Sequence, residues 1–231
     1  MKVYENIIIG NFLFALGWAI RDKKTAGPLG CAINLLQQTP ADKLLGDLLV
    51  GFEGVVRLIE FKREGARMSK EMGRHSLLAK SVVGTNMEAI SREVHWYIET
   101  AATDDALKTR IVPYLDAFPS ITKDQQLEDF IENLASQAVS QHATHTKEQI
   151  REYLSWVRMT QGDGAVGSGG LLLVVEPNGT LRYAPMRDLM DLNLEHQMWL
   201  AQEHHLAQQE HDLKLSKSLD HSPSKGLEYG R

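Results

Sequence analysis

Three charged residues, Asp47, Glu60 and Lys62, flank or interrupt two short apolar runs in the first third of the chain. The runs, residues 48–50 and 55–59, are rich in branched aliphatic side chains and are separated by Gly-Phe-Glu-Gly. Branched aliphatics favour strands, and glycine tolerates the positive φ of a tight turn, so this segment predicts a β-hairpin. Because side chains alternate between the two faces of a strand, the three charges should share one face.

Closing this hairpin symmetrically would place Val50 opposite Val55 and Asp47 opposite Leu58. An unpaired charge in a mostly buried strand is costly to desolvate, so the charged face needs a compensating group. Two neighbouring carboxylates suit a hard divalent cation, which prefers oxygen ligands and completes its shell with water or phosphate. A lysine beside them can orient an attacking water or stabilise negative charge that develops on a phosphate.

An aspartate, a hairpin and then Glu60-Phe61-Lys62 resemble the signature of the PD-(D/E)XK nuclease superfamily. The resemblance implies an α/β fold with a restriction-endonuclease-like αβββαβ core over residues 1–102. It also implies Asp47, Glu60 and Lys62 as catalytic residues, with Mg²⁺ or Mn²⁺ held by the two carboxylates. Glu5, at the start of the first expected helix, matches the glutamate that this family often adds to the metal site.

Each of these residues also has a simpler interpretation. A glutamate and a lysine on one strand face commonly pair with each other or with solvent. An acidic residue such as Glu5 is favoured near a helix N-terminus by the helix dipole alone.

A basic stretch follows the Glu-x-Lys motif directly. Between Arg57 and Lys80 the chain has seven Lys or Arg residues and three acids, although its formal net charge is -5. Local positive charge dominates phosphate binding, so a basic groove is compatible with an acidic chain. A solvated helix face with internal ion pairs is the alternative. The candidate nucleic-acid-binding residues are Arg63, Arg67, Lys70, Arg74 and Lys80.

The composition is that of an ordinary globular protein. The chain has 231 residues, of which 43% are hydrophobic and 24% charged, enough to bury a core. Its single cysteine, Cys31, cannot form an intramolecular disulfide, and the apolar segment 7–20 is too short for a membrane span. We therefore expect a cytoplasmic protein with no membrane contact, in which segment 7–20 forms an amphipathic helix.

Further elements follow from local patterns. A helix is expected after Gly65, which Gly73 could interrupt, and a strand over residues 94–98. From residue 103 to about 219 we expect a mainly α-helical extension, in which capping-box patterns at Thr122 and Thr146 mark two helix starts. An Asn-Gly turn predicts a further hairpin near residues 171–184, either at an edge of the main sheet or as a separate ribbon.

A long helix is expected over residues 186–215, where large apolar residues recur every seven positions: Leu192, Trp199, Leu206 and Leu213. The positions three residues further on are polar, so the stripe is narrow and suits packing on the domain, on a protein partner or in a homodimer. Residues 220–231 are rich in Ser, Pro and Gly and predict a disordered tail.

Two other motifs do not predict sites. The glycine-rich segment 162–170 lacks the lysine of a phosphate-binding loop and precedes a strand instead of following one. His142 and His145 lie in a short connection without the cysteines or helical spacing of a zinc site.

The sequence thus predicts a metal-dependent nuclease, with DNA favoured over RNA as substrate, acting alone or within a DNA-processing or phage-defence assembly. The alternative is a non-catalytic α/β interaction protein that binds a partner through its C-terminal helix.

Overall fold

The computed structural model describes residues 3–23, 27–35, 46–102, 106–119, 125–140, 143–161, 170–176, 178–186 and 208. All of its elements lie in one compact unit, residues 1–193. Their order is α1 (Glu5–Asp22), β1 (Leu29–Leu35), β2 (Leu48–Phe52), β3 (Val55–Arg63), α2 (Ser69–Val82), α3 (Met87–Val94), β4 (His95–Ala102), β5 (Leu107–Pro113), η1 (Tyr114–Asp116), α4 (Leu127–Ser140), α5 (Lys147–Gln161), β6 (Gly170–Val175) and β7 (Leu181–Met186). The expected helix over 186–215 and the tail over 220–231 lie outside the described residues, apart from residues 186 and 208.

Within the described residues, seven strands form one mixed sheet in the order β5-β4-β3-β2-β1-β6-β7. β3 and β4 are parallel, and the other neighbouring pairs are antiparallel. A parallel pair needs a crossover connection, which α2 and α3 supply. The α/β class is therefore confirmed, and the expected order of helix, hairpin, helix and strand is present.

The sheet continues past residue 102, where the sequence predicted a mainly helical extension to begin. β5 follows that boundary and pairs with β4 along its whole length. The hairpin of β6 and β7 also belongs to the main sheet, because β6 pairs with β1. Segments from both expected domains thus share one sheet, and the alternative of a separate ribbon is wrong.

The hairpin of β2 and β3 forms where the sequence predicts it, but its register differs. Phe52 pairs with Val55 around a two-residue turn at Glu53 and Gly54, where Gly54 has φ 77°. The symmetric closure that placed Asp47 opposite Leu58 is therefore wrong. Continuing the observed register by one step beyond β2 places Asp47 opposite Glu60. The shift is two residues, so every side chain keeps its expected face.

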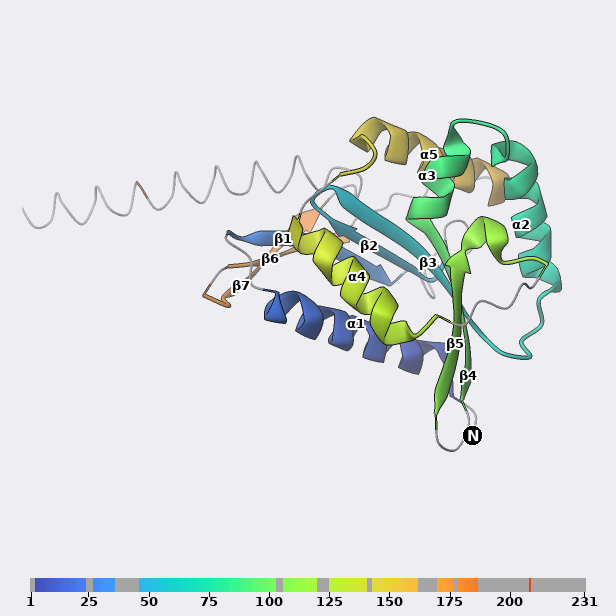
Figure 1. Cartoon of the computed structure of the whole chain (residues 1–231). Coiled ribbons are helices and arrows are strands. Elements are labelled where there is room, and N and C mark those ends of the chain that lie inside the picture. Colours follow the sequence, from blue (N-terminus) through green and yellow to red (C-terminus); the bar gives the residue numbers. More distant parts are fainter. Residues whose placement is uncertain are drawn as a thin grey trace, which may run out of the picture. The chain divides into compact units, whose positions relative to one another are not determined.

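The two faces of the sheet carry different layers of helices (Figure 1). α1 and α4 cover one face, and α2, α3 and α5 cover the other. Alternation along β3 explains the difference, because Ile59 and Phe61 join the apolar cluster with α1 and α4 while Glu60 points to the opposite face.

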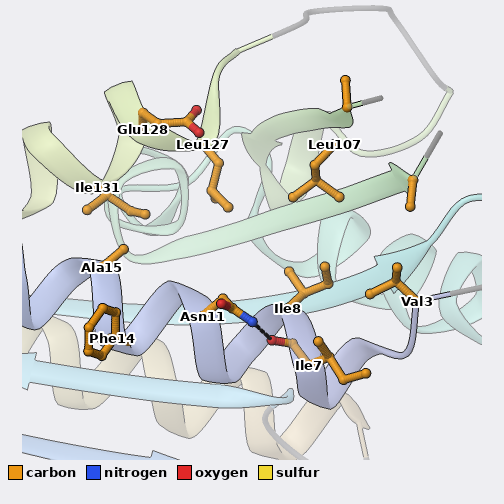
Figure 2. A pocket seen from close by; sticks show the side chains of 12 residues that line it. Val3, Ile7, Ile8, Asn11, Phe14, Ala15, Leu107, Leu127, Glu128 and Ile131 are labelled. Atoms are coloured by element: carbon orange, nitrogen blue, oxygen red, sulfur yellow. Dashed lines mark hydrogen bonds between the residues drawn. The ribbon is translucent and has the colours of Figure 1, made fainter. Parts of the chain in front are cut away.

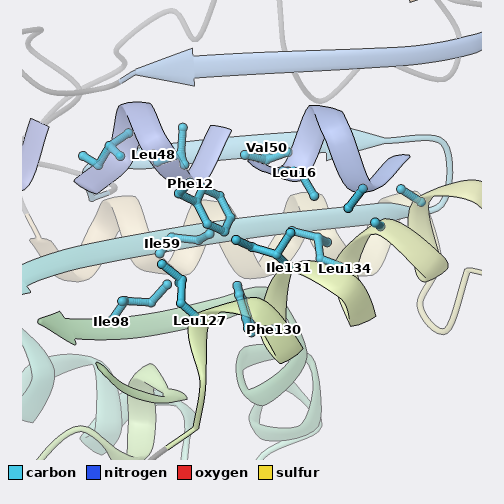
Figure 3. Close-up of a cluster of buried hydrophobic side chains, with 14 of the residues drawn as sticks. Phe12, Leu16, Leu48, Val50, Ile59, Ile98, Leu127, Phe130, Ile131 and Leu134 are labelled. Atoms are coloured by element: carbon cyan, nitrogen blue, oxygen red, sulfur yellow. The ribbon is translucent and has the colours of Figure 1, made fainter. Parts of the chain in front are cut away.

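The core between the sheet, α1 and α4 is built around Phe12 (Figure 3). Its ring is fully buried and lies 5.8 Å from the Phe61 ring and 6.2 Å from the Phe130 ring, between centroids. The apolar face expected for α1 is buried at Ile8, Phe12, Leu16 and Ala19 and half-buried at Ala15. The first helix thus forms and packs as its periodicity predicts.

Helix boundaries agree in part with the sequence patterns. α2 runs through Gly73 without a break. α4 begins at Leu127, later than the start expected at Thr122, a residue outside the described ranges. The capping box of α5 is confirmed, because the Thr146 N–H donates to Gln149 Oε1 at 2.8 Å and the Gln149 N–H donates to Thr146 Oγ1 at 3.2 Å.

None of the described helices has the length and the hydropathy needed for a transmembrane span.

The Phe12 core supplies a stability test. Phe12→Ala should lower the free energy of unfolding by about 3–5 kcal/mol, because it removes a fully buried ring and leaves a cavity. Phe14→Ala is the matched control on the same helix, since Phe14 is 75% exposed, and should cost less than about 1 kcal/mol. Urea denaturation measures both, and equal losses would contradict this description of the core.

Candidate functional site

The three charged residues singled out in the sequence meet on the sheet face that α2, α3 and α5 cover. Lys62 Nζ pairs with Glu60 Oε1 and lies 3.7 Å from Asp47 Oδ2. Asp47 and Glu60 are only 5% and 3% exposed, and Lys62 is half-buried. The convergence of two carboxylates and a lysine is therefore confirmed, in a setting that excludes most solvent.

Main-chain contacts fix the Asp47 carboxylate. The Asp47 N–H donates to the Ile59 carbonyl at 3.2 Å, and Asp47 Oδ2 accepts from the Phe61 N–H at 2.8 Å. Gly46, directly before it, has φ +133°, and a Cβ at this position would lie 3.2 Å from Glu60 Oε2. Both the backbone conformation and the close approach to Glu60 favour glycine here.

The electrostatics of the site are unbalanced. Burial raises the pKa of Glu60 well above its ordinary value, and the charge of Asp47 raises it further, against the opposing effect of Lys62. Burial lowers the pKa of Lys62, but the charges of Glu60 and Asp47 outweigh it and the net shift is upward. The lysine therefore stays cationic, while ionising Glu60 beside Asp47 is unfavourable in the metal-free protein.

Glu5 lies beside the same end of β3. Its Oε1 accepts a hydrogen bond from the main-chain N–H of Arg63 at 3.2 Å, one residue beyond Lys62. The structure thus brings the carboxylate from α1 next to the strand that carries the site. Its hydrogen bond there is to the main chain.

The five basic candidates differ in their surroundings. Arg63 is half-buried at the end of β3. Three are exposed: Arg67, Lys70 and Lys80. Arg74 has 15% of its side chain exposed, and its Nη1 lies 3.6 Å from Glu71 Oε2. Among the five candidates, Arg74 therefore differs in that its guanidinium lies beside a buried carboxylate.

Glu71 is a buried acid near the site that the sequence patterns did not single out. Glu71 is buried in the first turn of α2, and its Oε1 accepts a hydrogen bond from the Tyr114 hydroxyl at 2.5 Å. After burial and Asp47, its charge also raises the pKa of Glu60. The sequence does contain a signal for Glu71. Two polar side chains, Glu71 and His75, share the buried helical stripe of α2 with Leu78 and Val82.

A buried polar network lies behind Glu71. The Tyr114 ring stacks on the His95 imidazole, with centroids 4.1 Å apart. His95 Nδ1 lies 2.9 Å from the Tyr153 hydroxyl, which also lies 2.9 Å from Ser91 Oγ. Burial, together with a smaller effect of His75, lowers the pKa of His95 to about 3. His95 is therefore neutral and joins the sheet to α3 and α5 by packing and hydrogen bonding.

His145 and Cys31, which the sequence did not predict to form sites, have structural surroundings. His145 Nε2 lies 3.0 Å from Glu93 Oε2, while His142 lies outside the described residues. Cys31 is buried in β1, and burial raises the pKa of its thiol to about 12, as expected for an inert core cysteine.

The donor set fits a hard divalent cation held by two carboxylates. Among the residues that the structure describes, no group of three or more His, Cys, Asp or Glu side chains could hold a metal ion. Asp47, directly before β2, and Glu60, on β3, offer oxygen ligands, and a cation would relieve the repulsion between them. Mg²⁺ commonly binds one or two carboxylates and takes its other ligands from water and substrate phosphate.

The described residues also line an apolar cavity of about 460 Å³ (Figure 2). Residues of α1, α4 and the ends of β4 and β5 line it, among them Ile7, Phe14 and Leu107. Its polar lining consists of Asn11 and Glu128. None of the three site residues lines this cavity, so it is separate from the charged site.

Comparison of the chain with protein-family models, curated proteins and solved structures found no match.

The raised pKa of Glu60 predicts a pH-dependent effect on stability. In metal-free protein, the stability linked to Glu60 is fully present below its unfolded pKa of about 4.3 and is lost as the pH rises through the higher folded pKa. Glu60→Gln does not titrate, so its unfolding free energy relative to wild type should increase between about pH 5 and about pH 8.

Urea denaturation in EDTA at both pH values measures this difference. Glu152→Gln, the same change at an exposed position of α5, controls for the loss of formal charge. A difference that stays constant or falls with pH for Glu60→Gln would contradict the electrostatic description of the site.

Proposed function

We propose that this protein is a metal-dependent nuclease that hydrolyses phosphodiester bonds in nucleic acid, with DNA favoured over RNA. The observation that carries the proposal is the meeting of Asp47, Glu60 and Lys62 on one buried sheet face. Burying two carboxylates beside one lysine is costly, and a structural ion pair needs only one acid. A second acid at this position is explained by a cation that binds with the substrate.

The order of elements supports the same proposal. The resemblance to PD-(D/E)XK nucleases implies a helix, a hairpin, a second helix and a strand parallel to the hairpin. α1, the hairpin of β2 and β3, α2 and β4 follow that order, and β3 is parallel to β4. Glu60 and Lys62 lie near the C-terminal end of β3, beside the connection to α2, where a rigid strand can present side chains to a ligand.

Asp47 and Glu60 would hold Mg²⁺ or Mn²⁺. When bound, the metal ion lowers the pKa of water and neutralises negative charge on the leaving oxygen. The Asp47 carboxylate is already oriented by the Phe61 N–H, so little rearrangement is needed for it to act as a ligand.

Lys62 would orient the attacking water and stabilise negative charge that develops on the phosphate. Its Nζ donates to the Phe61 carbonyl at 3.2 Å as well as pairing with Glu60, which keeps the cation beside the carboxylates. Glu5 accepts a hydrogen bond from the Arg63 N–H and so supports the end of β3, the strand that carries Glu60 and Lys62.

The exposed cations of the α2 region would bind the nucleic-acid backbone. Arg67, Lys70 and Lys80 lie exposed on or just before α2, the helix that follows β3, in a chain whose formal net charge is -5. Such local charge attracts phosphate and makes binding depend on salt.

The proposal predicts cleavage of plasmid or duplex oligonucleotide by the full chain with Mg²⁺ or Mn²⁺, and none in EDTA. Glu60→Gln and Lys62→Ala should each lower the rate by about 100-fold or more, because the first removes a ligand charge that would hold the metal ion and the second removes the cation that would act on the reacting phosphate. Circular dichroism should show that both variants keep their fold.

Glu88→Gln is the matched control, since it removes a partly exposed carboxylate of α3 that pairs with Arg92. Its rate should equal that of wild type. Cleavage that survives both site substitutions would overturn the assignment. If wild type cleaves no nucleic acid with either metal, the non-catalytic alternative is favoured.

A further inference from the structure

The outward side of α1 is apolar and uncharged. Ile7 is 50% exposed, Phe14 75% and Trp18 64%. Their spacing of seven and four residues places these three side chains on one side of the helix, opposite the buried ring of Phe12. No Asp, Glu, Lys or Arg occurs from residue 6 to residue 20, although a helix side that faces water normally carries such residues. The outward side therefore has the composition of a contact surface.

A cavity lies beside the N-terminal half of this surface (Figure 2). Ile7 and Phe14 line the cavity, which has a volume of about 460 Å³, together with Leu107 at the start of β5. Trp18 does not line it. Because a helix rises 1.5 Å per residue, Trp18 lies about 16 Å further along α1 than Ile7. The helix thus presents a large exposed ring near one end and a hollow near the other.

The charge of this surface narrows the choice of partner. Nucleic acid binds cationic surfaces, and a helix that lies on a membrane typically carries Lys and Arg along its polar side. The stretch from residue 6 to residue 20 contains no cation. An apolar and uncharged partner fits better, and α1 of a second copy is such a partner.

A two-fold axis across α1 would bring ring and cavity together. Around such an axis the two helices run antiparallel, and every contact occurs twice. When the axis crosses α1 midway between Ile7 and Trp18, the Trp18 ring of one copy lies level with Ile7 of the other, beside the cavity. A parallel pair would instead place Trp18 against Trp18, away from both cavities. The polar lining of the cavity, Asn11 and Glu128, offers oxygen acceptors for the indole N–H.

The exposed area is sufficient for a weak dimer. The exposed fractions of Ile7, Phe14 and Trp18 correspond to roughly 400 Å² per copy. A two-fold contact buries this area on both copies and adds the cavity walls, which approaches the total of about 1,000 Å² that a biological interface needs. We expect a dissociation constant of about 10 µM. Below about 1 µM the chain is then monomeric, and Phe14→Ala remains a neutral control for the Phe12 core at that dilution.

We propose that the outward side of α1 is an interface between two copies of this chain, in which Trp18 of each copy enters the cavity of the other. α1 lies on the sheet face opposite the Asp47–Glu60–Lys62 site, so the partner copy leaves that site uncovered. The inference does not depend on the proposed function, because it concerns a different surface and is tested without nucleic acid.

Sedimentation equilibrium of the full chain in EDTA measures the association. Wild type should be mainly dimeric at about 100 µM and monomeric below about 1 µM. Trp18→Ala should raise the dissociation constant by about 100-fold or more, because each dimer loses the ring twice. Met159→Ala is the matched control, since Met159 is 71% exposed on α5, and it should leave the constant unchanged. Circular dichroism should show that both variants keep their fold.

A mixture of two variants tests the exchange of ring and cavity. Leu107→Glu places a charge on the cavity wall and should weaken association of that variant with itself. In the mixture, Trp18 of the Leu107→Glu chain can still enter the unchanged cavity of the Trp18→Ala chain. One of the two contacts is kept, so the mixed dimer should form about tenfold more tightly than either variant forms with itself. Sedimentation of fluorescein-labelled Trp18→Ala with unlabelled Leu107→Glu measures this.

Four results would overturn the inference. Wild type could stay monomeric at about 100 µM, or form a dimer that Trp18→Ala leaves unchanged, which would place the contact elsewhere in the chain. The mixed variants could associate no better than each one alone, which would contradict the exchange. Monomeric wild type could co-sediment with phosphatidylcholine–phosphatidylglycerol vesicles, which would assign the α1 surface to a membrane.

Discussion

The site depends on the repulsion between two buried carboxylates that share one lysine. The register, continued one step beyond β2, places Asp47 opposite Glu60 of β3, where burial already disfavours charge. Lys62 offsets only part of this cost, since the pKa of Glu60 stays raised despite the opposing charge of the lysine. Main-chain hydrogen bonds to Asp47 and the close approach of Gly46 nevertheless hold the acids in place. The proposed metal ion would relieve this repulsion, because a cation bound between the two acids neutralises their charge.

The two faces of the sheet have different roles: one packs against the apolar core, and the other carries the buried polar groups. On one face α1 and α4 pack around Phe12 in an apolar core that makes the central strands rigid. On the other face, buried polar groups extend from Glu60 through Glu71 and Tyr114 to His95, each with a partner of its own. Such networks specify one arrangement when their members are satisfied, because an unpartnered polar group in a low-dielectric interior is costly. The apolar layer thus carries stability, and the polar layer orients the charged side chains.

Local patterns predicted the elements whose signals are strong. The amphipathic face of α1, the hairpin of β2 and β3 and the capping box of α5 all appear where the residues indicate them. β1 and β5 have weaker signals, because β1 follows Gly27 and Pro28 and includes Gly30, and β5 carries Lys108 and Arg110. Their strand conformation comes from pairing with β2 and β4, which tertiary contact provides. Glu71 was missed for a similar reason, since an acid in the first turn of a helix is ordinarily explained by the dipole.

The sequence by itself determined that Asp47, Glu60 and Lys62 share a face, because alternation along a strand is a local property that survives a register shift of two residues. It likewise determined which side of α1 packs on the core. Only the tertiary structure decided that Asp47 lies opposite Glu60, that β6 and β7 extend the main sheet, and that the Tyr114 hydroxyl donates to the buried carboxylate of Glu71. These facts depend on the turn geometry and on contacts between segments far apart in the chain, which periodicity does not encode.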